Sequence, residues 1–132
     1  MNDIYISENF KLSEFESPDT KEVKVDEKLI NKLQQLRNRM GKPLIINSGY
    51  RTWEHHVSIY QELYGDAWED NISEKSLHLE GKAVDIHLGN IPYDADEMER
   101  LAEKIGFNGI GKYNTFIHLD VRPNGKARWD NR

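Results

Sequence analysis

The spacing of apolar residues predicts three amphipathic helices, over residues 27–40, 53–64 and 95–105. In each segment apolar side chains recur at intervals of three or four residues, which places them on one face of a helix. Asp26 and Asp94 stand immediately before the first and third segments, where a carboxylate can accept hydrogen bonds from free backbone N–H groups. A glycine follows each of these two helices and is expected to end it.

Short apolar runs at residues 44–46, 82–88 and 115–121 predict strands. Residues 65–76 are polar and rich in turn formers, so a loop is expected there. Residues 1–25 are predicted to form an amino-terminal arm with a few apolar anchors. Helices and strands occur in blocks without regular alternation, which indicates a small α+β domain spanning residues 1–132.

The two later strands each have an apolar face and a face that carries ionisable groups. Because side chains alternate along a strand, Ile86 and Ile117 lie on the apolar faces. The ionisable residues on the opposite faces are Asp85, His87, His118 and Asp120. These four side chains would converge on one patch if the two strands pair with each other.

Composition excludes several classes of protein. The chain has 132 residues, no cysteine and a net charge of −5. Disulfides and cysteine-ligated metals are excluded, and an acidic protein lacks the basic surface that nucleic acids require. No apolar run is long enough to insert into a membrane, and the amino terminus does not resemble a signal peptide. We therefore expect a protein that is cytoplasmic at synthesis and that acts elsewhere only if it is released or delivered.

Three residues form a candidate metal site. His78 lies seven residues before Asp85, and Gly81 between them permits a tight bend. Together with His118 they offer two imidazoles and one carboxylate, a set that suits a catalytic zinc ion with one open position for water. Spacing alone also fits ordinary polar residues, so both interpretations stay open at this point.

Two further groups of residues invite a functional interpretation. Arg51 follows the predicted strand at residues 44–46, where its guanidinium can hold a substrate carboxylate or form an ordinary ion pair. His55 and His56 are adjacent and point in different directions on a helix, which favours surface or pocket residues over a pair of metal ligands.

Three motifs resemble those of the zinc D-alanyl-D-alanine peptidase family, which shares its fold with hedgehog signalling domains. They are SGYRT at residues 48–52, SLHLEGKAVD at residues 76–85 and FIHLD at residues 116–120. The likeness covers nearly the whole chain, and it implies a small α+β domain with a central antiparallel sheet and helices packed against it.

The resemblance implies that one Zn²⁺ ion is held by His78, Asp85 and His118. It also implies that Arg51 binds a substrate carboxylate or steadies a polarised carbonyl, and that Ser76 lies near the metal and helps to shape the substrate site. The implied activity is hydrolysis of D-alanine-containing bonds in the stem peptides of bacterial peptidoglycan, by a D,D-carboxypeptidase or an endopeptidase. A phage lysin is one context in which the resemblance places such an enzyme.

The chain departs from the family at the general base. Many members place an acidic residue three positions before the last histidine ligand, where this chain has Thr115, and hedgehog domains place one six before, where it has Lys112. Asp120 is the best substitute, either as the base or as a support for a ligand or for Arg51. The missing carboxylate keeps two alternatives open, a zinc-containing binding module without catalysis and a structural phage protein with a relic site.

Overall fold

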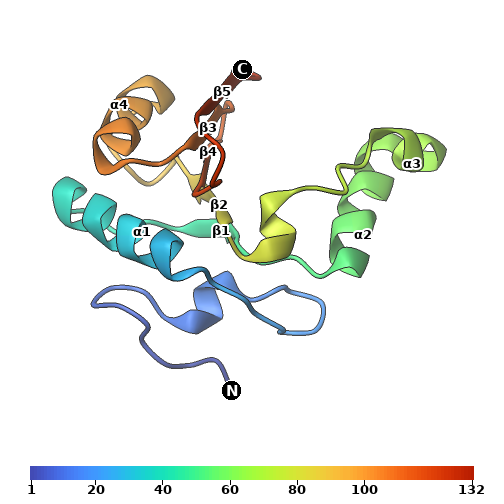
Figure 1. Cartoon of the computed structure of the whole chain (residues 1–132), viewed down its shortest axis with the longest axis horizontal. Coiled ribbons are helices and arrows are strands. Elements are labelled where there is room, and N and C mark those ends of the chain that lie inside the picture. Colours follow the sequence, from blue (N-terminus) through green and yellow to red (C-terminus); the bar gives the residue numbers. More distant parts are fainter.

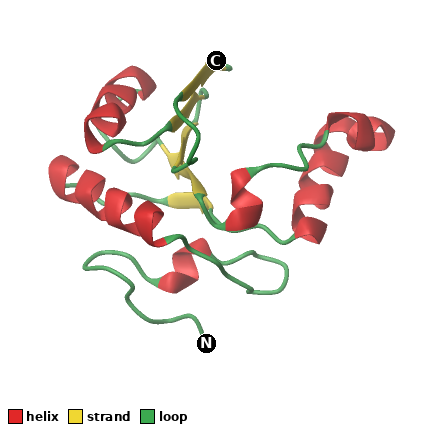
Figure 2. Cartoon of the chain, viewed as in Figure 1, coloured by secondary structure: helices red, strands yellow, loops and turns green.

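A five-stranded sheet with the order β1-β2-β4-β3-β5 forms the centre of the computed structural model, which describes residues 1–132 (Figures 1 and 2). The strands are β1 (Ile46–Ser48), β2 (Ala83–His87), β3 (Gly109–Lys112), β4 (Phe116–Asp120) and β5 (Ala127–Asp130). The first four pair antiparallel, as the family resemblance implies, whereas β5 pairs parallel with β3. The sequence pattern indicates neither β3 nor β5.

Helices lie on both sides of this sheet. They are α1 (Glu27–Met40), α2 (Trp53–Tyr64), α3 (Trp68–Asn71) and α4 (Ala95–Ile105), with short 3-10 turns η1 (Leu12–Phe15), η2 (Gly65–Ala67) and η3 (Leu77–Glu80). Helices α1 and α4 cover one side of the sheet, while α2 and α3 project from the other as an arm (Figure 1). The three long helices have the predicted bounds, and the side chains of Asp26 and Asp94 cap α1 and α4. No helix is both long and apolar enough to cross a bilayer.

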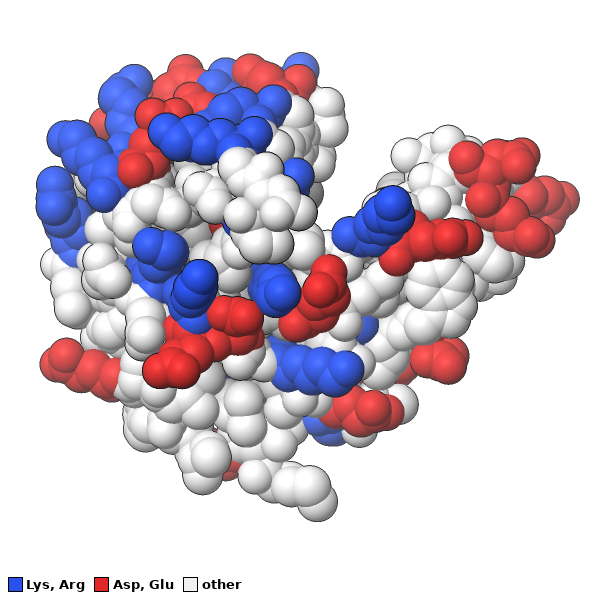
Figure 3. Space-filling model, viewed as in Figure 1, with Lys and Arg blue, Asp and Glu red and all other residues white.

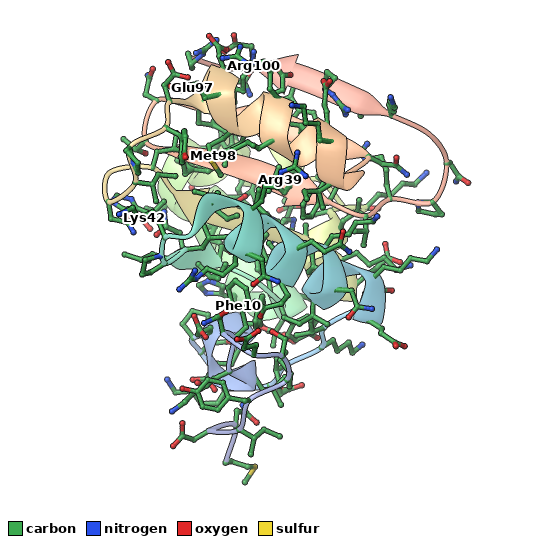
Figure 4. The ribbon with its side chains drawn as sticks, turned by 90° about the vertical axis from the view of Figure 1, so that its left-hand side faces the viewer. Phe10, Arg39, Lys42, Glu97, Met98 and Arg100 are labelled. Carbon is green, nitrogen blue, oxygen red and sulfur yellow. The ribbon has the colours of Figure 1, made fainter.

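The hydrophobic core lies between the sheet and the α1–α4 layer. Figure 4 shows the two helices in front of the sheet, with Met98 of α4 and Phe10 on either side of α1. Met98 is fully buried, and Phe10 and Phe15 anchor the amino-terminal arm in the same cluster. The apolar faces of β2 and β4 supply Ile86 and Ile117 to this core, both fully buried. Their opposite faces therefore look away from the core, towards α2.

Two local predictions are wrong in part. The strand expected at residues 44–46 begins only at Ile46, because Leu44 enters the core, Ile45 is exposed and pairing with β2 begins at Ile46. Residues 65–76 are not a continuous loop, since η2 and the single turn of α3 occupy residues 65–71. Hydrogen bonds from the Asn71 side chain and the Ile72 N–H to carbonyls one turn earlier hold that short helix.

Strand β3 contains two glycines because side chains from neighbouring strands fill the space above them. A Cβ atom at Gly109 would collide with the carboxylate of Asp120, and one at Gly111 would collide with the ring of Trp129. Glycine is a poor strand former, so the apolar pattern misses β3.

Substitution of Gly109 by alanine is expected to destabilise the protein by about 1–3 kcal/mol, because the buried carboxylate of Asp120 must move. Thermal unfolding would show this as a midpoint lowered by several degrees. The matched control is Gly89→Ala, whose new methyl group meets only the far end of the His87 side chain. Equal midpoints for the two variants would contradict the expectation.

Candidate metal centre

Two strands and one 3-10 turn bring His78, Asp85 and His118 together. Asp85 on β2 is the cross-strand partner of His118 on β4, so their side chains stand on the same face of the sheet. His78 lies in η3, and Gly81 ends that turn in the left-handed conformation, with a φ of 70°. One ligand atom from each of the three residues lies within 4.8 Å of the others.

The spacing of these atoms matches what a tetrahedral metal ion requires. Asp85 Oδ1 is 3.3 Å from His78 Nε2 and 3.1 Å from His118 Nδ1. Zinc bonds of about 2.0–2.1 Å at tetrahedral angles separate two ligand atoms by about 3.3 Å. Two of the three pairs of ligand atoms therefore already have the separation that a zinc ion requires, and the third pair lies within 4.8 Å.

The second nitrogen of each imidazole is already held by an oxygen acceptor. His78 Nδ1 lies 2.7 Å from the carbonyl oxygen of Gly49, and His118 Nε2 lies 2.7 Å from Asp120 Oδ2. A carbonyl oxygen only accepts, so Nδ1 of His78 carries the hydrogen. Nε2 of the neutral ring then has a free lone pair. The same arrangement directs Nδ1 of His118 towards the cluster. These outer hydrogen bonds fix ring orientation and tautomer, as they commonly do in metal sites.

Asp120 lies behind His118 and is completely buried. Its Oδ1 accepts from the backbone N–H and Nε of Arg122, and its Oδ2 accepts from Nη2 of Arg122 at 2.7 Å. Both carboxylate oxygens of Asp120 are thus held by Arg122 and by Nε2 of His118. They lie on the side of the His118 ring that faces away from Asp85.

Arg51 is held at three of its nitrogens. Nη2 lies 3.3 Å from Asp85 Oδ2, Nε donates to Ser48 Oγ at 3.0 Å, and Nη1 lies 3.3 Å from His56 Nδ1. The carboxylate of Asp85 therefore has one oxygen at the histidine cluster and the other on Arg51. Loop residues after β1 place this guanidinium beside the histidine–aspartate cluster.

Burial and the surrounding charges set the protonation of the cluster. Burial lowers the pKa of His78, and the charge of Asp85 offsets only part of that effect. Burial also acts to lower the pKa of His118, but hydrogen bonds with Asp120 and Asp85 outweigh it and raise the pKa above its usual value. Burial raises the pKa of Asp85, but the charge of His78 and hydrogen bonds from both histidines leave it well below the usual range. The carboxylate of Asp85 is therefore ionised at the centre of the cluster, where it favours a cation.

The cluster opens into a cleft of about 1080 Å³. Figure 3 shows this cleft as the hollow between the body of the molecule and the projecting arm of α2 and α3. The α2 side of the cleft carries Ile59, Tyr60, Leu63 and Tyr64; the other side carries Trp129 and residues 122–126 of the β4–β5 loop. An open groove of this shape accommodates an extended chain better than a small enclosed ligand.

The other residues considered in the sequence lie outside the cluster of His78, Asp85 and His118. Ser76 precedes η3 and lines the cleft beside His78. Lys112 forms ion pairs with Asp96 and Glu99 on the α4 side, away from the cluster. Thr115 is exposed, immediately before β4.

Two further residues at the site carry little signal in the sequence. His56 is completely buried beside Arg51. The ring centroid of Trp129 lies 5.0 Å from that of His118, and Nε1 of Trp129 donates to the hydroxyl of Tyr113. Gly111 is a sequence signal for the position of Trp129, because a glycine inside a strand often marks the close approach of another group.

A small α+β domain that gathers two imidazoles and a carboxylate beside an open cleft defines a metallohydrolase class of site. The chain belongs to the peptidase M15 family, whose model matches residues 8–120. It is 29% identical over 103 residues to the peptidoglycan L,D-endopeptidase MepK of Escherichia coli K12, covering 75% of this chain and 52% of that protein. It is 26% identical over 105 residues to a probable peptidoglycan L,D-endopeptidase MepK of Haemophilus influenzae, covering 76% and 52%. The chain spans about half the length of these curated relatives.

Proposed function

We propose that this protein is a zinc-dependent peptidase that cleaves stem peptides of bacterial peptidoglycan. The observation that carries the proposal is the convergence of His78, Asp85 and His118 at an open cleft, with both imidazoles oriented by outer hydrogen bonds. Family membership and the peptidoglycan endopeptidases among its relatives support the same substrate class. The proposal includes two activities. One is endopeptidase cleavage of an L,D bond, and the other is cleavage at D-alanine.

His78, Asp85 and His118 would hold the ion. Bound there, zinc would supply Lewis acidity and lower the pKa of a coordinated water. Ser76 lies beside His78 at the cleft and is proposed to contact the substrate backbone.

Arg51 is proposed to hold a carboxylate or a polarised carbonyl of the substrate. A guanidinium has five N–H groups. Three of them face Ser48, His56 and Asp85, which leaves two for a ligand in the cleft. Because the group is held at three separate nitrogens, its plane is set before the substrate arrives, which reduces the cost of ordering it on binding.

Asp120 is proposed to position His118 and not to act as the general base. Its oxygens accept from Arg122 and lie against the outer nitrogen of His118, so neither points towards a water at the cluster. A buried carboxylate in this place also strengthens the imidazole as a ligand.

The test is digestion of purified muropeptides by protein loaded with one equivalent of zinc, with products identified by mass spectrometry. Loss of a terminal D-alanine would identify a D,D-carboxypeptidase, and splitting of cross-linked or L,D-linked peptides would identify an endopeptidase. His118→Ala is the negative control. Absence of product from every muropeptide, with zinc bound, would overturn the proposal in favour of a non-catalytic binding module. The lack of a carboxylate at Thr115 or Lys112 is the observation that favours this second candidate.

Zinc affinity is expected to decrease as the pH falls, beginning above the usual histidine pKa of about 6.5. The raised pKa of His118 in the metal-free protein means that a proton already competes with zinc near neutral pH. His78, whose pKa is lowered, adds competition only at more acidic pH. Chelator competition at a series of pH values should give a loss of about tenfold per pH unit below the His118 pKa. A flat profile across this range would contradict a two-histidine site.

A further inference from the structure

His56 is the one residue of α2 that is buried, and it is completely buried. Its ring packs against Tyr60, with centroids 4.9 Å apart, and against Trp53 at 5.9 Å. Both ring nitrogens have partners. Nδ1 lies 3.3 Å from Nη1 of Arg51, and Nε2 lies 2.8 Å from the carbonyl oxygen of Ser73.

These two partners determine the tautomer of the ring. A carbonyl oxygen only accepts, so Nε2 of His56 must carry the hydrogen and donate it to Ser73. A guanidinium only donates, so Nδ1 must be the bare nitrogen that accepts from Arg51. The neutral Nε2–H form satisfies both contacts at once, and no other form of the imidazole does.

We propose that His56 is a positioning residue that holds the Arg51 guanidinium in the orientation that receives the substrate. This inference rests on the proposed function, because it assumes that Arg51 contacts the substrate. Ser48 and Asp85 hold Nε and Nη2, and His56 supplies the third contact, at Nη1. The Ser73 carbonyl in turn fixes the imidazole, so the ring connects the loop before η3 to the arginine.

His56 differs from its neighbours in the kind of contact it makes with Arg51. The hydroxyl of Ser48 both donates and accepts, and Asp85 is shared with the histidine cluster. His56 instead offers a neutral acceptor on a ring whose direction is fixed by its hydrogen bond to the Ser73 carbonyl. It therefore orients Arg51 without cancelling the positive charge that a substrate carboxylate would use.

The first experiment compares His56→Leu with His56→Asn in the zinc-loaded protein. Leucine fills the space but accepts no hydrogen bond, and asparagine can return an oxygen acceptor near the place of Nδ1. We expect kcat/KM on muropeptides to fall on the order of tenfold in His56→Leu and to recover in large part in His56→Asn, with zinc stoichiometry unchanged. His55→Leu, on the same helix and without a contact to Arg51, is the matched control.

A second experiment separates positioning from general stability. In an Arg51→Ala background, His56→Leu should cause no further loss of kcat/KM, because its target has been removed. An equal loss in both backgrounds would overturn the inference and assign His56 a purely structural role.

A third measurement needs neither activity nor variants. Long-range ¹H–¹⁵N NMR spectra of the wild-type protein should show a bare Nδ1 and a protonated Nε2 on His56. The opposite tautomer would overturn the inference even if every variant fails to fold. Failure of the proposed function is distinguishable, since it would appear as a wild-type protein that binds zinc and gives no product while the NMR signature is retained.

Discussion

Asp85→Asn is expected to abolish both zinc binding and peptidase activity. Asp85 Oδ1 lies between the ligand nitrogens of His78 and His118, and its other oxygen contacts Arg51. Asparagine preserves the shape but removes the negative charge that a divalent ion requires between two neutral imidazoles. The loss of affinity should exceed the ~10–100-fold that loss of an outer hydrogen-bond partner costs. Calorimetric titration with zinc measures it directly.

The matched control for this substitution is Asp70→Asn, which changes an exposed carboxylate on α3 outside the cleft. Zinc stoichiometry and turnover should equal those of the wild type in this variant. Zinc bound with wild-type affinity by Asp85→Asn would contradict the assignment of the metal site.

Asp120→Asn is expected to weaken zinc binding about 10–100-fold while leaving substantial turnover when zinc is saturating. The substitution removes the carboxylate that orients His118 and raises its pKa. The pKa of His118 should therefore fall, and the onset of proton competition should move to lower pH. Zinc titrations and steady-state kinetics at two zinc concentrations separate these effects.

The opposite pattern would identify Asp120 as the general base. In that case turnover would collapse at every zinc concentration while the affinity for zinc stayed unchanged. The chain contains its own control at the carboxyl terminus, where Asp130 accepts from the backbone N–H, Nε and Nη2 of Arg132 just as Asp120 does from Arg122. Asp130→Asn breaks the same kind of pair on the surface and should change neither zinc affinity nor turnover.

The helices illustrate what can be predicted from sequence. The bounds of α1, α2 and α4 follow from local signals: apolar spacing, a capping carboxylate before α1 and α4, and a glycine after them. Such signals act within a few residues, so no tertiary contact is needed to locate them. The alternating faces of β2 and β4 were predictable for the same reason, but only the pairing of the two strands in the structure places Asp85 and His118 on one side of the sheet.

Strands β3 and β5 were not predictable in this way. Gly109 and Gly111 have no side chains to show a pattern, and their place in the sheet depends on Asp120 and Trp129, which arrive from distant parts of the chain. The parallel pairing of β5 with β3 is likewise a long-range contact with no local signature.

The sequence by itself determined the residue types of the site, the local elements that carry them and, through its motifs, the family. Only the tertiary structure decided how each group is used. It placed Asp120 behind His118, where Arg122 donates hydrogen bonds to it, and it placed a neutral His56 where Nδ1 accepts from Arg51. The physical reason is that the direction of a hydrogen bond and the tautomer of a buried imidazole depend on which atoms lie within about 3 Å, and folding alone brings those atoms together.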